Sequence, residues 1–226
     1  MLRSDFDRLL ETLQSDLGEM GRLVEETTKQ AIRALQNRDA DLAQQVIDHD
    51  DVIDNLQDTL ETKCLGILAT QQPAATDLRT VMSVVHMGVE LERMGDYAEG
   101  IAKICLRIYQ EPLLKPLIDI PRMAELALKM LNEGLQAFAE RDEDLARKVC
   151  ADDDAVDDLY DQIYRELLTY MLEDPRNIQR ATYLLWVAHD LERIADRATN
   201  IAERVIWLIS GGSVSTRALK SERSLR

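Results

Sequence analysis

The sequence has few of the residues that break helices and few of those that favour sheets. Its 226 residues include only 9 Gly and 5 Pro, and aromatic residues make up 4%. The scarcity of Gly and Pro leaves long stretches free to form helices, and the scarcity of aromatic residues argues against a β-sandwich or β-barrel. Hydrophobic residues nevertheless account for 46% of the chain, which suffices for a folded core. The composition therefore predicts an all-α protein.

Positive charge is also in short supply. The chain has 27 Lys and Arg against 42 Asp and Glu, a formal net charge of -15. Such a surface repels DNA, RNA and anionic lipid and attracts cations, so we expect no nucleic-acid partner. The sequence has no apolar run of about 18 residues, the length that a membrane-spanning helix needs, so we expect no direct membrane insertion.

The three cysteines do not form a recognisable framework. Cys64, Cys105 and Cys150 are odd in number and widely spaced, and no CxxC motif occurs. Each falls within a helical pattern, where a small buried apolar residue is the ordinary interpretation. Met1 to Leu10 contains no apolar run of signal-peptide length. We therefore expect a cytoplasmic protein with reduced thiols.

Apolar residues at helical spacing predict six helices. Three of the five prolines, Pro112, Pro116 and Pro121, cluster in the middle of the chain and predict a linker there. Gly211-Gly212 is expected to end the last helix. The helices are expected over about 5–36, 39–71, 76–109, 122–140, 142–173 and 176–209. The resulting organisation is a first three-helix repeat (1–111), a Pro-rich linker (112–121), a second three-helix repeat (122–210) and a disordered polar tail (211–226).

The second half of the chain repeats the first. Twelve of the 27 residues in 34–60 are identical to those in 137–163, and seven of the 17 in 86–102 are identical to those in 186–202. The two offsets, 103 and 100, differ by three residues at the turns around Pro73 and Pro175, where insertions are tolerated. Short connections favour antiparallel neighbours. We therefore predict two tandem three-helix bundles that arose by internal duplication.

The repeat includes carboxylates as well as apolar residues. In each repeat an Asp pair and a Glu/Asp pair are spaced i,i+4, which places both members on one helix face. The two pairs are also equidistant from the turn proline, so an antiparallel hairpin brings them to the same level. The eight candidate metal ligands are Asp50, Asp54, Glu92 and Asp96 in the first repeat and Asp153, Asp157, Glu192 and Asp196 in the second.

The direction of these acids follows from the turn of about 100° per residue in a helix. They fall away from the apolar stripes, so we expect them on the outer flank of the bundle. Like charges at i,i+4 cost about 0.2–0.5 kcal/mol per pair. One explanation of the clusters is a bound cation; a second is salt bridges from Arg93 and Arg193; a third is a solvated acidic face. Oxygen ligands suit iron in its oxidised form, manganese, magnesium or calcium.

Other site chemistry finds little support. His49, His86 and His189 are not repeated between the halves, and His189 stands in HxxE, the reverse of the ExxH order of di-iron carboxylate bundles. No catalytic triad, P-loop, GxGxxG or HExxH motif occurs. We therefore expect no catalytic residues and no enzyme activity.

Several segments resemble the PhoU family of bacterial phosphate-uptake regulators. They are the run Gln72 to Arg79, the run Glu90 to Asp96, the run Asp190 to Glu203 and the closing Glu203 to Trp207. The resemblance extends over roughly residues 5–210. It departs from internal symmetry where Gly100 stands opposite Asn200, which suggests that the two metal sites differ in occupancy.

The resemblance implies both a fold and a role. It implies two three-helix bundles, and a cytoplasmic protein that represses the phosphate-starvation response. It also implies contact with the ATPase subunit of the phosphate transporter and with the phosphate sensor histidine kinase, and E(D)xxxD motifs that bind iron or other metal clusters in some members. We also expect a homodimer. The alternatives are a carboxylate-bridged iron store or oxidase, and a structural dimer whose acids are only solvated.

Overall fold

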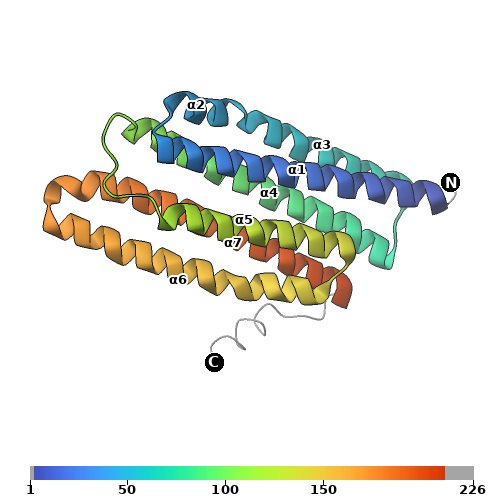
Figure 1. Cartoon of the computed structure of the whole chain (residues 1–226). Coiled ribbons are helices and arrows are strands. Elements are labelled where there is room, and N and C mark those ends of the chain that lie inside the picture. The colour runs from blue at the N-terminus through green and yellow to red at the C-terminus, as the bar shows by residue number, and fades with distance from the viewer. Residues whose placement is uncertain (1–2, 212–226) are drawn as a thin grey trace.

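Long helices account for nearly all of the computed structural model, which describes residues 3–211. Within this range there is no strand. In each repeat the chain runs up, down and up again, and the two repeats lie side by side (Figure 1). The predicted all-α architecture is confirmed. The elements are α1 (Arg3–Asn37), α2 (Ala40–Asp48), α3 (Asp50–Gln71), α4 (Ala75–Ile108), α5 (Asp119–Glu140), α6 (Glu143–Glu173), the 3-10 helix η1 (Pro175–Asn177) and α7 (Ile178–Ser210).

Equivalent caps show how the repeated sequence sets equivalent corners. Asp39 caps α2 by accepting a hydrogen bond from the backbone N–H of Leu42 at 3.0 Å. Asp142 caps α6 in the same way, accepting from Leu145 at 2.9 Å. Each cap follows an arginine in the left-handed region, with φ 55° at Arg38 and 58° at Arg141. The repeated Arg-Asp therefore ends one helix and begins the next.

The second predicted helix is interrupted at His49, which corrects the expected single helix over 39–71. His49 has φ -97° and ψ -2°, and it separates α2 from α3. Its ring Nδ1 lies 2.7 Å from the carbonyl oxygen of Gln45, so the side chain competes for a backbone acceptor of the helix. The second repeat has Asp152 at this position, and α6 passes through it unbroken. Asp50 and Asp51 consequently stand in the first turn of a new helix, where the helix dipole favours negative charge.

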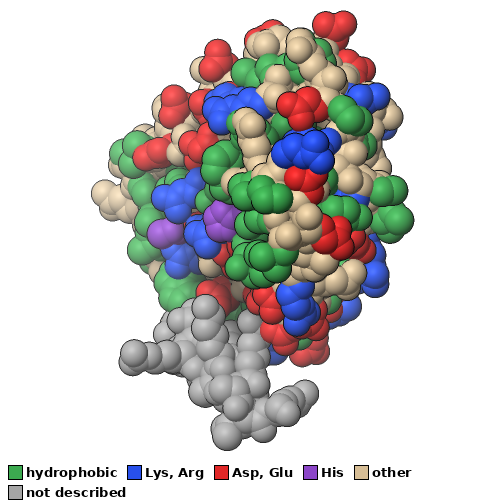
Figure 2. Space-filling view, turned by 90° about the vertical axis from the view of Figure 1, so that its left-hand side faces the viewer, with side chains coloured by type: hydrophobic (Ala, Val, Ile, Leu, Met, Phe, Trp, Pro, Cys, Tyr) green, Lys and Arg blue, Asp and Glu red, His purple; other side chains and the backbone are tan. Residues whose placement is uncertain are grey.

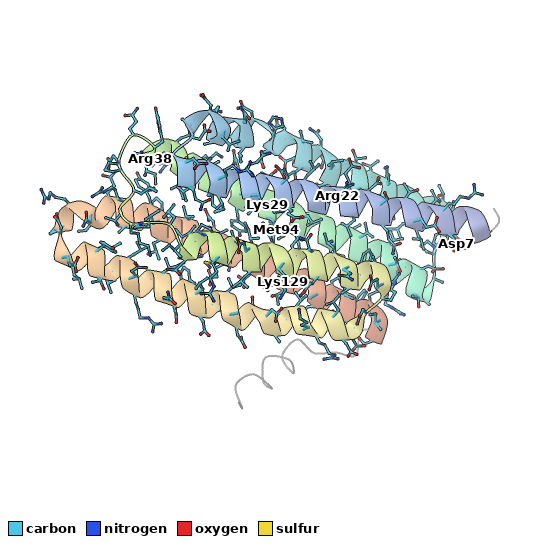
Figure 3. The ribbon with its side chains drawn as sticks, viewed as in Figure 1. Asp7, Arg22, Lys29, Arg38, Met94 and Lys129 are labelled. Carbon is cyan, nitrogen blue, oxygen red and sulfur yellow. The ribbon has the colours of Figure 1, made fainter. Side chains whose placement is uncertain are left out.

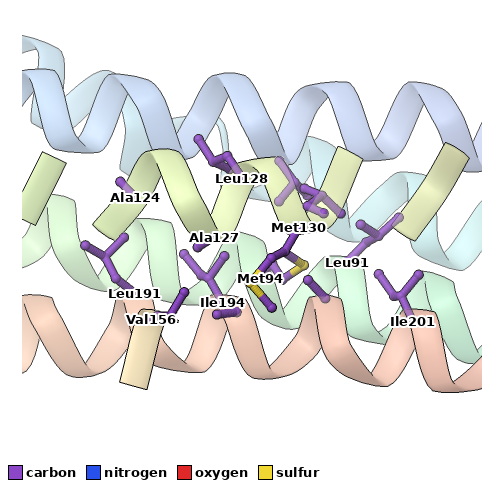
Figure 4. Packing of buried hydrophobic residues seen from close by; sticks show 14 of the residues in the cluster. Leu91, Met94, Ala124, Ala127, Leu128, Met130, Val156, Leu191, Ile194 and Ile201 are labelled. Atoms are coloured by element: carbon purple, nitrogen blue, oxygen red, sulfur yellow. The ribbon is translucent and has the colours of Figure 1, made fainter. Parts of the chain in front are cut away.

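One apolar core joins the two repeats. Met94 of α4, Met130 of α5 and Leu191 of α7 are at most 1% exposed and belong to the same cluster (Figure 4). The helix α4 packs along α7, while α1 meets α5 on the other side of the molecule. Each repeat is thus the predicted three-helix bundle, but the bundles share their interior instead of standing apart.

The linker is shorter than predicted and is held in place. Pro121 lies in the first turn of α5, where proline is tolerated, so the connection after α4 ends at Ile118 instead of residue 121. Lys115 within it is 8% exposed and pairs with Glu166 of α6. Its Nζ also lies 3.7 Å from Oδ2 of Asp119. The sequence pattern could not predict this burial, because Lys115 lies outside the helices and helical periodicity gives no information about it.

Replacing Lys115 with alanine is expected to destabilise the protein by about 1–3 kcal/mol, because the acids around it lose a partly desolvated partner. Urea unfolding followed by far-ultraviolet circular dichroism measures this loss. Lys129→Ala is the matched control: Lys129 forms only exposed pairs with Glu133 and Asp152, so its loss is expected to stay within about 1 kcal/mol. An equal loss in both variants would mean that Lys115 does not fix the linker.

The ends of the chain and the cysteines agree with the sequence where the structure describes them. Gly211 follows α7 with φ 77°, a left-handed cap that favours glycine. Cys64, Cys105 and Cys150 are all buried and none of them forms a disulfide, as predicted. The expected polar tail lies outside the described residues from position 212 onward. Within residues 3–211, no helix combines the length and the low charge needed to cross a bilayer.

Candidate metal centres

The first repeat brings its four predicted acids into electrostatic contact between α3 and α4. Burial raises the pKa of both Glu92 and Asp96, and the charge of Asp54 on α3 raises both further across the helix pair. Asp50 in turn interacts with Asp54 and Asp96. The prediction that the two i,i+4 pairs lie level with each other is therefore realised in the structure. We refer to these four residues as the first carboxylate centre.

Sequence reasoning missed a fifth acid in this centre. Glu99 of α4 interacts with Asp50 and Asp96. It forms an ion pair with Lys103 on its exposed side. Its spacing of three residues after Asp96 could have indicated it, but the second repeat has Thr199 there, so Glu99 is not one of the repeated acids.

Asp50 is the least satisfied member of the first centre. Its Oδ1 is buried and receives no hydrogen bond from any described residue. Gly95 lies beside it, and a Cβ at Gly95 would come within 3.1 Å of Ile53 Cδ1. A buried carboxylate oxygen without a donor is unfavourable unless a proton or a cation approaches it. The prediction that all four acids face outward is thus wrong for this oxygen, although Asp54 and Asp96 are exposed.

The pKa values in the first centre are raised by burial and by the neighbouring negative charges. Burial, followed by the charges of Glu99, Asp54 and Asp96, raises the pKa of Asp50 to about 6. Burial also raises the pKa of Glu92, with the negative neighbours adding to the shift and Arg93 opposing it. Each shift favours protonation of the carboxylate. A bound positive ion would reduce the same repulsion between the negative charges.

The second centre has the same composition and a different degree of burial. Burial and then the charges of Asp153, Glu192 and Asp196 raise the pKa of Asp157 to about 6. Asp153, however, is only 8% exposed and accepts a hydrogen bond from Thr199 at 3.2 Å. Outward orientation is therefore wrong for Asp153 as well. The unbroken α6 carries it toward α7, whereas its equivalent Asp50 starts a helix.

Salt bridges account for part of the second centre and for none of the first. Arg193 donates to Asp196 at 2.8 Å, and His189 contacts Glu192 at 3.0 Å. Arg93, the equivalent of Arg193, forms no ion pair with a described residue. The explanation by arginine salt bridges thus holds for one carboxylate in the second repeat. In the first repeat the charges of Arg93 and Lys103 only oppose the raised pKa values, without an ion pair to any of the four acids.

The Gly100/Asn200 difference also affects the contact between the repeats, and the expected difference in metal occupancy stays a prediction. Asn200 donates to Glu90 of α4 at 3.0 Å, and Arg197 donates to the same oxygen at 3.1 Å. At the equivalent place Gly100 faces Asp190, whose Oδ2 would lie 3.0 Å from a Cβ. Burial raises the pKa of Asp190 to about 6. The residue pair therefore distinguishes the two ends of the α4/α7 seam.

The carboxylates of each centre are close to one another, but they are not arranged as a complete set of metal ligands. Among residues 3–211, no three His, Cys, Asp or Glu side chains already stand at ligand distance from a common point. What the structure provides is two clusters of oxygen donors on rigid helices, with excess negative charge and an unsatisfied oxygen in the first. Hard cations are the chemical class that such donors fit.

Charge crowding gives the metal-free protein a distinctive pH dependence. The folded-state pKa of Asp50 and of Asp157 is about 6, above the value of about 3.9 for an unfolded aspartate. The folded state therefore binds more protons between about pH 4 and 6, and the stability that these groups contribute below pH 4 is lost as the pH rises through 6.

Accordingly, the free energy of unfolding of the Asp50→Asn/Asp157→Asn variant should exceed that of the wild type increasingly from pH 4 to 6 and level off above. Urea titrations in the presence of a chelator measure this difference. The control is Asp58→Asn/Asp161→Asn, an exposed equivalent pair on the same helices. A difference that does not vary with pH would contradict the assigned crowding.

A separate groove lies between α1 and α5, away from both centres. It has a volume of about 600 Å³, and Ile32, Ala124 and Leu128 contribute to its lining. Lys29 on α1 and Lys129 on α5 stand at its two sides (Figure 3). Both lysines already pair with acids of their own helices, Glu25 and Glu133. The groove therefore offers a mixed surface and no cluster of convergent chemical groups.

Comparison with known proteins agrees with this architecture. The family model described as PhoU domain matches twice, over residues 17–105 and 120–205. The phosphate-specific transport system accessory protein PhoU homolog of Aquifex aeolicus is 43% identical over 213 residues, which cover 94% of this chain and 96% of the relative. The accessory protein PhoU of Escherichia coli is 35% identical over 93% of this chain and 87% of its own length.

Solved structures show the same fold. The crystal structure of PhoU from Pseudomonas aeruginosa superposes with a TM-score of 0.87 at 40% identity, covering 91% of this chain and 99% of that one. The phosphate transport system regulatory protein PhoU from Streptococcus pneumoniae gives a TM-score of 0.86 at 33% identity, covering 93% and 99%. With two matched domains and relatives along nearly its whole length, the chain belongs to the PhoU family.

Proposed function

We propose that this chain is a negative regulator of phosphate uptake that acts as an adaptor between the phosphate transporter and its sensor kinase. Its relatives are accessory proteins of phosphate-specific transport, matched over nearly their whole length. That full-length match is the observation that carries the proposal. The partners are the transporter's ATPase subunit and the sensor histidine kinase, and the protein works in the cytoplasm by binding instead of catalysis.

The shape and charge of the molecule suit such a role. Two bundles with one shared core form a rigid body with long helix faces, and rigid faces bind protein partners without a large ordering cost. The net charge of -15 disfavours operator DNA. Any effect on transcription then passes through another protein, which in this proposal is the kinase.

Each repeat is also proposed to hold one or more oxygen-preferring cations, with iron, manganese, magnesium and calcium as candidates. In the first repeat the ligands are Asp50, Asp54, Glu92 and Asp96. The unpaired buried oxygen of Asp50 supports this assignment. In the second repeat they are Asp153, Asp157, Glu192 and Asp196. A bound cation supplies positive charge that the clusters lack, and so ties α3 to α4 and α6 to α7.

A deletion strain tests the regulatory role. Without this protein, phosphate-uptake genes are expected to remain expressed when phosphate is plentiful, because the kinase no longer receives the repressing contact. A transcriptional reporter measures the expression, and reintroduction of the wild-type chain is the control. Normal repression in the deletion strain would overturn the proposal. So would tight binding of purified protein to operator DNA at physiological salt, since the proposal sends the signal through protein contacts alone.

A further inference from the structure

A stripe rich in arginine and tryptophan follows the seam between α4 and α7, on the side away from α1 and α5. The two helices are antiparallel, because Glu90 contacts Asn200 while Arg107 lies over Tyr183. Positions seven apart share one face of a helix. The stripe consists of His86, Arg93, Gly100 and Arg107 on α4 and Trp186, Arg193, Asn200 and Trp207 on α7.

The high share of arginine in this stripe is unusual for the chain. Three of its eight members are arginines, although acids outnumber bases in the chain by 42 to 27. Neither Arg93 nor Arg107 forms an ion pair with any described residue. Arg204, next to the stripe, likewise has no acidic partner within residues 3–211, and burial lowers its pKa. Figure 2, which looks at the end of the molecule that lies on the left in Figure 1, shows His side chains beside Lys and Arg side chains.

The aromatic residues of the stripe are placed as binding residues commonly are. Trp186 is 48% exposed and packs edge-on against Tyr183, with ring centroids 5.6 Å apart. Arg204 covers Trp207, with Cζ 4.2 Å from the ring centroid, and Arg107 stands 6.0 Å above Tyr183. Trp, Tyr and Arg are the residue types that contribute most to binding energy at protein interfaces. This surface combines them with Arg93 and Arg107, two exposed arginines that form no ion pair with a described residue.

We propose that this arginine–tryptophan stripe binds an acidic segment of a protein partner, with the arginines pairing to its carboxylates and the tryptophans covering its apolar side chains. The inference rests on the proposed adaptor role, which requires such a surface, and adds where one partner sits and what chemistry it has.

A narrow protein segment fits the stripe better than an extended anionic surface does. Asp96 and Asp196 stand on the outer flanks of α4 and α7, where they interact with Asp54 and Asp157. A membrane or duplex laid across the seam would meet these acids on both sides and be repelled. A single acidic segment running along the seam meets the arginines of the stripe. The Glu90 carboxylate in the seam is already paired with Arg197 and Asn200, and Asp190 beside Gly100 is half-buried.

The chain contains a built-in reporter for the test. Its only two tryptophans are Trp186 and Trp207, so intrinsic fluorescence observes the proposed surface directly. The probe is a synthetic amphipathic peptide of Glu and Leu, compared with the same peptide carrying Lys in place of Glu. The glutamate peptide is expected to change the tryptophan emission saturably, and the lysine peptide is expected to leave it unchanged.

Charge-reversal variants distinguish an effect of the stripe on peptide binding from an effect of the net charge of the protein. The Arg93→Glu/Arg107→Glu variant is expected to bind the glutamate peptide with an affinity at least about tenfold lower than that of the wild type. Arg22→Glu/Arg33→Glu on α1 changes the net charge equally at exposed positions and is expected to alter affinity less than about twofold. Circular dichroism checks that both variants are folded, which exposed positions favour. Equal weakening by the two variants, or stronger binding to phosphatidylserine vesicles than to the peptide, would overturn the proposal.

Complementation of the deletion strain separates the two proposals. The stripe assignment expects the Arg93→Glu/Arg107→Glu variant to leave the reporter derepressed while the α1 control restores repression. If the stripe variant restores repression as well as the control does, the proposed binding role of the stripe is wrong, and the proposed regulatory function is unaffected. If the deletion strain represses normally from the start, the regulatory function itself fails, and the peptide titration still decides whether the stripe binds acidic segments.

Discussion

Replacing Asp54, Glu92 and Asp96 with alanine is expected to abolish metal binding in the first repeat and to leave the helices folded. These three side chains contribute most of the oxygen donors of the centre, and without them a cation there keeps only Asp50 and Glu99 nearby. Asp54 and Asp96 are exposed and Glu92 is half-buried, so truncation leaves no large core cavity. The loss should therefore be seen in metal content and not in helicity.

Metal analysis of purified protein gives the readout, with iron and manganese loaded separately. The control is Asp41→Ala/Asp58→Ala/Glu61→Ala, which removes three exposed acids of the same repeat outside the centre. The second repeat provides an internal reference, because its centre remains intact in both variants. If the triple variant unfolds, the acids are structural; if it keeps its metal, the first centre is misplaced.

The two centres should not respond alike, and the reason lies in features that the sequence does not display. The periodicity and the position of Pro73 were enough to predict that Asp54 and Glu92 lie level. They could not show that His49 breaks the helix, because its effect depends on a ring nitrogen competing for the carbonyl of Gln45. They could not place Asp153 against Thr199 either, since that depends on how α6 rotates against α7.

The same contrast holds for the contact between repeats. The internal repeat predicted two bundles, and each is present. Nothing in the pattern of either half showed how the halves pack, because an apolar stripe looks the same whether it meets its own bundle or the other one. Asn200 illustrates this: in the sequence it is a departure from symmetry near a motif, whereas in the structure it donates to Glu90 across the seam.

The shared core predicts that the repeats unfold together. Leu91 and Leu191 are equivalent residues, each 0% exposed, on the two helices that form the seam. Leu91→Ala and Leu191→Ala are each expected to destabilise the protein by about 2–5 kcal/mol, the cost of a large-to-small change in a core that cannot collapse around the cavity. Because α4 packs on α7, each change should lower the same transition.

Thermal unfolding monitored by calorimetry and by circular dichroism tests this directly. A single transition is expected in the wild type and in both variants, with the midpoint lowered to a similar extent whichever repeat carries the substitution. Leu65→Ala on α3 serves as the control, since that leucine is 58% exposed and its loss should cost within about 0.5 kcal/mol. Two separate transitions, only one of which moves in each variant, would show that the repeats are independent domains. A regulator built that way could relay a metal or partner signal from one bundle to the other only through the linker, whereas a single cooperative core couples both centres to the α4/α7 seam.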